Sequence, residues 1–162
     1  MECRPLETTL ISAEDLKDVN LVSKMDVYAV VTINGNPKTK QKSPVDKDCG
    51  SNPKWNYTKK FTVEEAAANQ NRLNLVIRLW SKRLLGDIVI GDVLVPIKEF
   101  LDCEEKVSVY NVRLLNGKVK GTLNLCCKTV EKFSVPVAAP PPARTPVSFP
   151  VIGGVGGASL PC

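Results

Sequence analysis

The stretch Arg78–Val93, RLWSKRLLGDIVIGDV, joins two apolar runs through a short tip that contains a glycine. The residues that lead into it, LNLVIRL at 73–79, carry leucine or isoleucine at every second position. This period of two is the pattern of a β-strand that buries one of its faces. Because a run rich in isoleucine and valine follows the tip at once, the stretch predicts an antiparallel hairpin within a sheet.

Strand patterns of the same kind recur on both sides of this hairpin. Together with residues 73–80, the predicted strands are Leu6–Ala13, Val27–Ile33, Lys38–Lys42, Trp55–Thr62, Ile88–Ile97, Lys106–Leu114 and Gly121–Val130. Helical patterns are confined to Glu64–Asn71 and Lys98–Leu101, and the pair Asn116-Gly117 is typical of a hairpin turn. Eight short strands in about 130 residues predict an all-β fold, namely an eight-stranded antiparallel β-sandwich.

The composition changes sharply near Phe133. Residues 134–162 hold seven of the twelve prolines and four of the ten glycines. Proline lacks a backbone N–H donor, so such a segment cannot form regular helix or ladder hydrogen bonds. We therefore expect a sandwich domain over residues 1–133 and a disordered Pro/Gly-rich tail over residues 134–162. The tail is either a tolerated, solubilising segment or a ligand for a proline-recognising protein or a membrane partner.

The composition also excludes several classes of function. The chain has 22 basic and 17 acidic residues, a net charge of +5, and no histidine. Histidine is the commonest general base and metal ligand, and no paired-carboxylate motif or phosphate-binding glycine loop is present to replace it. We therefore expect that the protein is not an enzyme. The mild positive charge and the few aromatic side chains argue against a nucleic-acid partner.

The six cysteines do not follow a metal-binding or secretory pattern. The amino-terminal residues MECRPLETT lack the apolar core of a signal peptide, and no Cys-x-x-Cys pair occurs. These features predict a cytoplasmic chain whose cysteines are reduced, either as small buried side chains or as surface thiols.

Four blocks of sequence resemble the C2 domain family. LETTLISAEDL at 6–16 is similar to the opening strand of the family, and SKMDVYAVVTI at 23–33 is similar to its SDPYV strand. GSNPKWNYTKKF at 50–61 and IGDVLVPIKEFL at 90–101 match two later blocks in order and spacing. Together with the Pro/Gly-rich tail, they resemble small plant C2 proteins of the cold-regulated type. The resemblance implies the type II, circularly permuted connectivity and a role in stress or defence signalling.

In calcium-binding C2 domains, acidic side chains of the first and third loops coordinate the ion. The family's first-loop aspartate falls on Asn20, and its third-loop pair of aspartates falls near Ser81 and Arg83. Calcium takes about 6–8 oxygen ligands, several of them carboxylates. The acidic residues that remain as candidate ligands are Asp18, Asp26 and Asp87. We expect no required cofactor, with calcium at these three residues as the alternative; Asp26 alternatively serves only as a structural hydrogen-bond acceptor.

The tips of the first and third loops combine apolar and basic side chains. Their residues are Leu21, Val22, Lys24, Lys82, Arg83, Leu84 and Leu85. Lysine and arginine are attracted to anionic lipid, and exposed leucines can enter the membrane interface. The pattern therefore predicts a membrane-binding tip. The alternative is that Leu84 or Leu85 folds back and covers the end of the sandwich.

A second basic cluster is predicted on the face of a strand. Alternation in PKTKQK would project three lysines from one face of the segment 38–42, with two more on the following strand. The cluster consists of Lys38, Lys40, Lys42, Lys59 and Lys60. In several family members, a lysine cluster at this place binds phosphoinositide headgroups. Alternating lysines are also typical of a solvent-facing strand or of a protected sheet edge.

These observations favour a non-enzymatic adaptor that binds anionic phospholipid membranes. We expect it on the cytosolic face of the plasma membrane or an endomembrane, attached peripherally. Two alternatives remain: a protein-interaction module that uses its loops or its tail, and a calcium-dependent phospholipid sensor.

Overall fold

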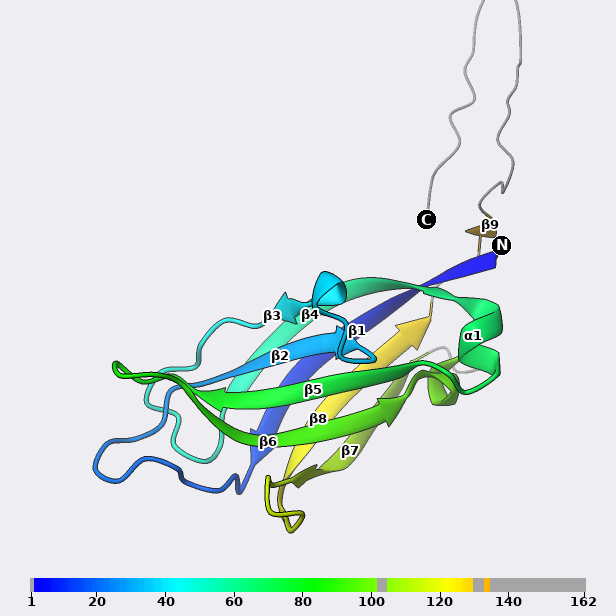
Figure 1. Cartoon of the computed structure of the whole chain (residues 1–162). Helices are drawn as coiled ribbons and strands as arrows, with labels where there is room; N and C mark the ends of the chain where they lie inside the picture. The colour runs from blue at the N-terminus through cyan, green and yellow to red at the C-terminus, as the bar shows by residue number, and fades with distance from the viewer. Residues whose placement is uncertain (1, 102–104, 130–132, 135–162) are drawn as a thin grey trace, which may run out of the picture.

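The computed structural model describes residues 2–101, 105–129 and 133–134, which form an all-β domain (Figure 1). The strands are β1 (Glu2–Glu14), β2 (Val27–Ile33), β3 (Gln41–Lys42), β4 (Lys54–Glu64), β5 (Asn74–Ser81), β6 (Ile88–Pro96), β7 (Lys106–Arg113), β8 (Val119–Thr129) and β9 (Phe133–Ser134). The helical elements are the helix α1 (Glu65–Asn69) and the 3-10 turns η1 (Pro37–Thr39) and η2 (Ile97–Phe100). The predicted fold class is confirmed.

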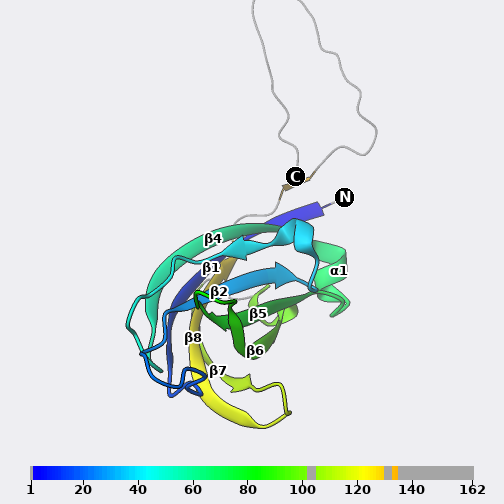
Figure 2. The same cartoon turned by 60° about the vertical axis from the view of Figure 1, so that its left-hand side comes forward.

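The strands form two packed layers, which Figures 1 and 2 show from two sides. The hydrogen-bonded order β3-β2-β5-β6 makes one layer, and β7-β8-β1-β4 makes the other. The layers meet where β6 pairs with β7 at Asp92 and Arg113, and every strand pair is antiparallel. The short β9 pairs with the start of β1 and was not predicted. An antiparallel sandwich of eight strands, β1 to β8, is therefore confirmed.

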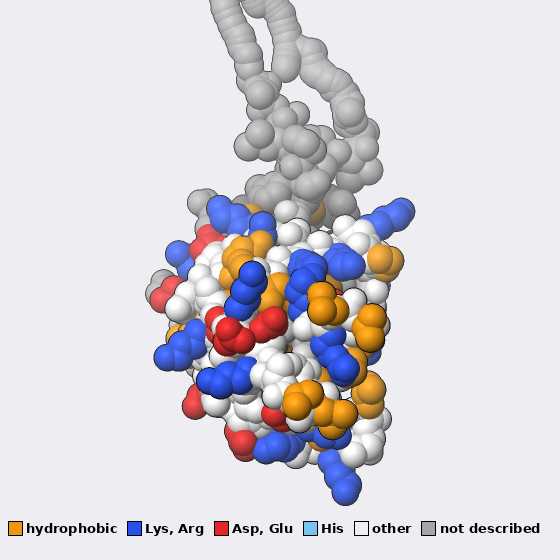
Figure 3. Space-filling view, turned by 90° about the vertical axis from the view of Figure 1, so that its left-hand side faces the viewer, with side chains coloured by type: hydrophobic (Ala, Val, Ile, Leu, Met, Phe, Trp, Pro, Cys, Tyr) orange, Lys and Arg blue, Asp and Glu red, His pale blue; other side chains and the backbone are white. Residues whose placement is uncertain are grey.

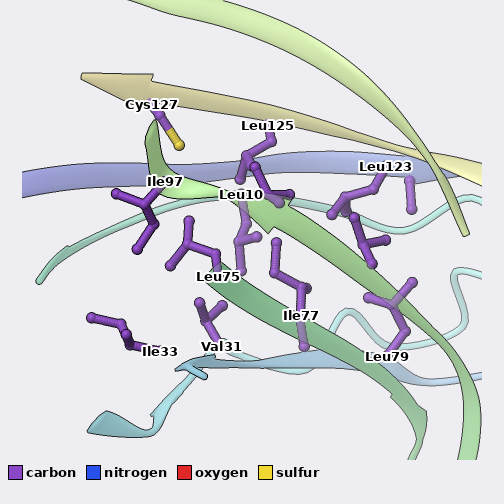
Figure 4. Packing of buried hydrophobic residues seen from close by; sticks show 14 of the residues in the cluster. Leu10, Val31, Ile33, Leu75, Ile77, Leu79, Ile97, Leu123, Leu125 and Cys127 are labelled. Carbon is purple, nitrogen blue, oxygen red and sulfur yellow. The ribbon is translucent and has the colours of Figure 1, made fainter. Parts of the chain in front are cut away.

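The core lies between the layers and follows the alternation seen in the sequence. Leu75, Ile77 and Leu79 of β5 are completely buried. They point towards Leu10 of β1 and Leu125 of β8 in the other layer (Figure 4). Burying one leucine or isoleucine stabilises a fold by roughly 1.5–3 kcal/mol. The residues between them on β5 face outward, so one strand supplies both core and surface.

The predicted strand Lys38–Lys42 is confirmed only at its end, as β3. Pro37–Thr39 forms the turn η1, and only Gln41–Lys42 pairs with β2. The Asn36 side chain accepts a hydrogen bond from the Lys38 backbone N–H at 3.0 Å, and Pro37 stands in the first turn, where its fixed φ favours helical geometry. This local capping prevents an extended backbone, so Lys38 and Lys42 do not share a strand face.

The cysteines do not all remain thiols. Cys3 is buried and disulfide-bonded, which contradicts the prediction that every cysteine is reduced. The other described cysteines, Cys49, Cys126 and Cys127, are free. Of the predicted tail, only Ser134 lies among the described residues, in β9; residues 135–162 lie outside them, so the domain boundary stays a prediction.

Three loops meet at one end of the sandwich, on the left in Figure 1. They are the first loop (residues 15–26, between β1 and β2), the second loop (43–53, between β3 and β4) and the third loop (82–87, between β5 and β6). We call them the tip loops. Each of these loops joins one strand to the next at this end of the sandwich, so the order of the strands brings the three segments together.

At Gly121, β8 packs closely against the end of β1 and the start of the first loop. A Cβ atom at Gly121 would lie 2.8 Å from the Glu14 carbonyl oxygen and 2.7 Å from that of Asp15, and its φ is +88°. Gly117 has a similar φ of +86°, but open space surrounds it. We expect Gly117→Ala to lower the free energy of unfolding by about 1 kcal/mol through backbone strain. Gly121→Ala should cost about 2 kcal/mol more because of the clash.

Urea unfolding of the two variants measures the difference. Equal losses for Gly117→Ala and Gly121→Ala would show that the clash is relieved and that only the backbone conformation matters.

Candidate functional site

The tip loops enclose an open groove of about 570 Å³, which we call the tip groove. All three loops contribute to its walls. The lining residues are Asn20, Ser23, Lys24, Asp26, Val45, Lys47, Lys82, Arg83, Leu84 and Leu85. The structure therefore brings together the predicted basic and apolar residues of the first and third loops, and it adds Lys47 of the second loop.

The predicted apolar residues of the tip loops all project into solvent. The exposed fractions of the side chains are 96% for Leu21, 100% for Val22, 103% for Leu84 and 100% for Leu85. The alternative in which Leu84 or Leu85 covers the end of the sandwich is therefore wrong. Figure 3 views this end of the molecule and shows blue basic side chains interleaved with orange apolar ones. Exposed apolar side chains gathered at one place are typical of a binding surface.

The third loop is shaped by hydrogen bonds to Asp87. Its carboxylate accepts one bond from the Tyr28 hydroxyl at 2.5 Å and another from the Arg83 backbone N–H at 3.0 Å. These two bonds, helped by the nearby Lys82 and Lys42, hold the pKa of Asp87 below its usual value. Burial and the bond to Asp87 raise the pKa of Tyr28 to about 12. The charged Asp87 carboxylate therefore connects the third loop to β2, and we call this connection the brace at Asp87.

The first loop is closed by an uncharged pair. The Ser81 hydroxyl at the end of β5 donates to Asn20 Oδ1 at 3.0 Å, and Asn20 Nδ2 donates to the Lys24 carbonyl oxygen at 3.2 Å. Asn20 and Ser81 are two of the positions at which the family resemblance places acidic ligands. Here they bind each other, and Asp18 accepts a hydrogen bond from the Asn20 backbone N–H at 2.9 Å.

The remaining candidate carboxylates accept hydrogen bonds within the protein. Asp26 Oδ1 accepts the Asp48 backbone N–H at 2.8 Å, and both oxygens of Asp87 already accept hydrogen bonds. Within the described residues, which include all three tip loops, no group of three or more acidic or cysteine side chains is arranged to hold a metal ion. Calcium needs several free carboxylate oxygens at one point, and this groove instead carries Lys82 and Arg83.

The predicted lysine cluster is divided between two surfaces. Lys40 and Lys42 line a second groove of about 700 Å³ on the outer face of β2 and β5, which we call the strand-face groove. Lys59 and Lys60 belong to β4 in the other layer, where Lys60 pairs with Glu7 at 3.9 Å. Lys38 lies in η1 and does not line the groove. The strand-face groove therefore contains two of the five predicted lysines, and Lys59 lines a smaller cavity together with Gln41 of β3.

Sequence analysis did not predict the residues of β2 and β5 that line the strand-face groove, among them Arg78, Trp80 and Tyr28. Arg78 and Trp80 line it from β5, and the Trp80 ring stacks against Tyr28 with 6.4 Å between the ring centroids. The Lys42 ammonium lies 4.5 Å from the centre of the Tyr28 ring, within cation–π range. Arg78 and Trp80 occupy outward positions of the alternating stretch 73–79 and its continuation, so the alternation itself could have placed them on the surface. Lys47 had no such signal, because loop paths do not follow a period.

Replacing Tyr28 tests the brace at Asp87. Tyr28→Phe removes the hydroxyl donor, so the pKa of Asp87 should rise towards 3.8, as carboxyl NMR titration would show. The depressed pKa means that Asp87 stabilises the fold above its unfolded pKa and that this contribution is lost as the pH falls through the folded value. The variant should therefore lose less stability than the wild type between pH 4 and lower pH. An unchanged Asp87 titration would contradict the bond.

Comparison with known proteins adds sequence relatives. The chain is 52% identical to the protein SRC2 homolog of Arabidopsis thaliana over 90% of its own length and 47% of the relative. It is 46% identical to protein SRC2 of Glycine max over 99% of its length and 59% of the relative. The chain thus spans about half the length of these two relatives. It is also 30% identical to elicitor-responsive protein 3 of Oryza sativa subsp. japonica, over 66% of the chain and 70% of the relative.

Structural comparison shows the same fold. A C2 domain of plant extended synaptotagmin 1 superposes with a TM-score of 0.70 at 19% identity, over 82% of this chain and 97% of that one. None of the described helices has the length and apolar character needed to cross a membrane. The C2 domain family model matches residues 4–128, which include both layers of the sandwich and all three tip loops. The chain therefore belongs to the C2 domain family.

Proposed function

We propose that this protein is a non-enzymatic adaptor that attaches peripherally to anionic phospholipid membranes through its tip loops. The observation that carries the proposal is the complete exposure of Leu21, Val22, Leu84 and Leu85 beside basic residues of the same loops. Leucines on a folded surface lie in water at a cost unless a partner covers them. A lipid surface accepts apolar tips and attracts the cations around them, so it matches both parts of the surface.

The expected energies suit reversible attachment. Each lysine or arginine near an anionic leaflet contributes about 1 kcal/mol, so Lys24, Lys82 and Arg83 would supply about 3 kcal/mol. A leucine contributes up to roughly 1.5–3 kcal/mol if it is fully buried in the interface. The basic part weakens as salt screens it, whereas the apolar part does not. No cation has to bridge the tip to lipid in this mechanism, because the protein supplies the positive charge itself.

The strand-face groove supports a second contact with lipid headgroups. Lys40 and Lys42 line it together with the stacked aromatic rings of Tyr28 and Trp80, and the Lys42 ammonium lies over the Tyr28 ring. Arg78 is held by Asp92 through two hydrogen bonds of 2.7 and 3.1 Å, so its charge is partly neutralised. We propose that Lys40 and Lys42 bind a phosphorylated headgroup from the side while the tip loops enter the interface.

A role in stress or defence signalling at the cytosolic face of a plant membrane belongs to the same proposal. It is supported by the rice relative named elicitor-responsive protein 3. Residues 135–162 of the Pro-rich tail lie outside the described residues, so a protein partner of the tail stays a prediction. A protein-interaction module is the competing function, and it differs in that lipid binding would be incidental.

Co-sedimentation of the full chain with vesicles tests the proposal. We expect binding to vesicles that contain phosphatidylserine, little binding to vesicles of phosphatidylcholine alone, and no loss of binding in chelator. Binding that appears only with calcium would support the sensor instead. Failure to bind in both conditions would favour a protein partner.

Charge reversal of Lys82 and Arg83 should remove most of the electrostatic attraction. The double variant Lys82→Glu/Arg83→Glu should bind anionic vesicles at least about 100-fold more weakly, given about 1 kcal/mol for each charge lost and each charge introduced. The matched control is Lys98→Glu/Arg72→Glu, because both residues are exposed and lie at the opposite end of the sandwich. Equal effects of the two double variants would show that net charge, rather than the third loop, governs binding.

The apolar tip makes a separate prediction. Leu84→Ser/Leu85→Ser should weaken vesicle binding by about 10- to 100-fold even at high salt, because the lost burial is not screened. Leu94→Ser/Val109→Ser is the control, since these strand residues are 62% and 63% exposed but lie outside the tip loops. Thermal unfolding should be nearly unchanged for both double variants. A salt-independent loss in the control as well would argue against insertion of the third loop.

A further inference from the structure

The two layers of the sandwich leave β7 with an open edge (Figures 1 and 2). On one side β7 pairs with β8 along most of its length. On the other side, within the described part of the chain, it pairs with β6 only at Arg113. A strand directs backbone N–H and C=O groups to both sides, so those of residues 106–111 that face β6 have no ladder partner there. Such an edge is a template for pairing with another chain.

The side chains of this edge do not protect it from pairing. Residues 107–111, VSVYN, carry no charge. Val107 and Val109 are exposed on the outer face of the layer. The opposite border strand of the same layer, β4, carries three lysines, and lysines on an edge strand discourage pairing with other sheets. Of these two borders, β7 is therefore the one that favours strand addition.

The edge is complementary to a second copy of itself. In an antiparallel pair centred on Ser108, Val107 of each copy lies opposite the partner's Val109, and such apolar cross-strand pairs stabilise a sheet. The Ser108 hydroxyl oxygen is buried near the Tyr110 side chain, but it makes no hydrogen bond of normal geometry among the described residues. In this register it faces the partner's Ser108 across the two-fold axis, where one hydroxyl can donate to the other.

The charges at the two ends of the edge agree with the same register. Glu105 directly precedes β7 and Arg113 ends it; both are exposed, and neither forms an ion pair with another described residue. The partner's Glu105 would lie opposite Asn111 and diagonal to Arg113, at a spacing of about 7–8 Å that long side chains can bridge. Two-fold symmetry creates this contact twice. The pairing also ends before Arg113, so β6 keeps its place beside that residue.

We propose that β7 is a self-association edge, at which two copies of this protein form an antiparallel dimer centred on Ser108. The layers β7-β8-β1-β4 of the two copies then join into one continuous sheet. A single strand pair buries less than the about 1,200 Å² typical of stable complexes, so we expect a weak dimer that depends on concentration. Because the pairing is antiparallel, the two sets of tip loops lie at opposite ends of the dimer. Dimer formation is therefore independent of the proposed membrane contact.

Val109→Lys tests the edge, because it places a charge in both contacts with Val107. Sedimentation velocity of the full chain over a concentration series should show a reversible monomer–dimer equilibrium, and the variant should dimerise at least about ten-fold more weakly. Leu94→Lys is the matched control, since Leu94 is similarly exposed but lies on β6, and its dimer should match that of the wild type. A wild type that stays monomeric up to about 1 mM would overturn the proposal, and so would equal weakening by the two variants.

Charge reversal tests the register without touching the centre of the edge. Glu105→Arg and Arg113→Glu should each weaken the dimer about five-fold, because each change turns both diagonal contacts into like-charge contacts. An equimolar mixture of the two variants should regain the wild-type affinity, since every arginine of one chain then meets a glutamate of the other. A mixture that dimerises no better than either variant alone would overturn the antiparallel register. A dimer that neither single change weakens would assign self-association to a different surface and overturn the proposal.

Discussion

The start of β2 is the point on which the arrangement of the tip loops depends. The Asp26 carbonyl oxygen accepts from Lys82 of the third loop, and the Asp26 carboxylate accepts from Asp48 of the second loop. The next residue, Val27, exchanges backbone hydrogen bonds with Asp46, and its carbonyl oxygen also accepts from Trp55 Nε1 at 3.2 Å. Two consecutive residues at the junction of the first loop and β2, Asp26 and Val27, thus orient the second and third loops. Because these acceptors lie at the end of the buried strand β2, packing of the core fixes the positions of the second and third loops.

Much of the fold was predictable because the core obeys a simple period. Leu75, Ile77 and Leu79 alternate in the sequence and are fully buried in the structure, and β2 has the same bounds as its prediction. The prediction of a strand was wrong at Lys38 because Asn36 and Pro37 fix a turn there, although the lysines of this segment alternate as in a strand. The prediction of a reduced Cys3 was wrong because disulfide formation depends on which other cysteine lies beside it in the fold. Composition and spacing do not give the distance between two cysteines.

Some features of the candidate site were likewise predictable from the sequence, and others were not. Exposure of Leu84 and Leu85 agrees with their place on a tight tip, because a short loop beyond the end of a sheet has no neighbour to cover it. The role of Lys47 was hidden, since the second loop follows no period and its approach to the third loop depends on the hydrogen bond at Asp26. The pairing of Asn20 with Ser81 was equally hidden, because those residues are 61 positions apart in sequence.

Tyr28 lines the strand-face groove and is connected to Arg83 of the tip groove through Asp87, and this connection has a thermodynamic consequence. Its ring forms part of the floor of the strand-face groove under Lys42, while its hydroxyl holds Asp87 at the base of the third loop. A ligand that displaces Lys42 would alter the field around Asp87, and a displacement of the third loop would alter the position of the ring. Linkage requires such effects to be reciprocal. If each groove binds a ligand, occupancy of either one should therefore change the affinity of the other by the same factor.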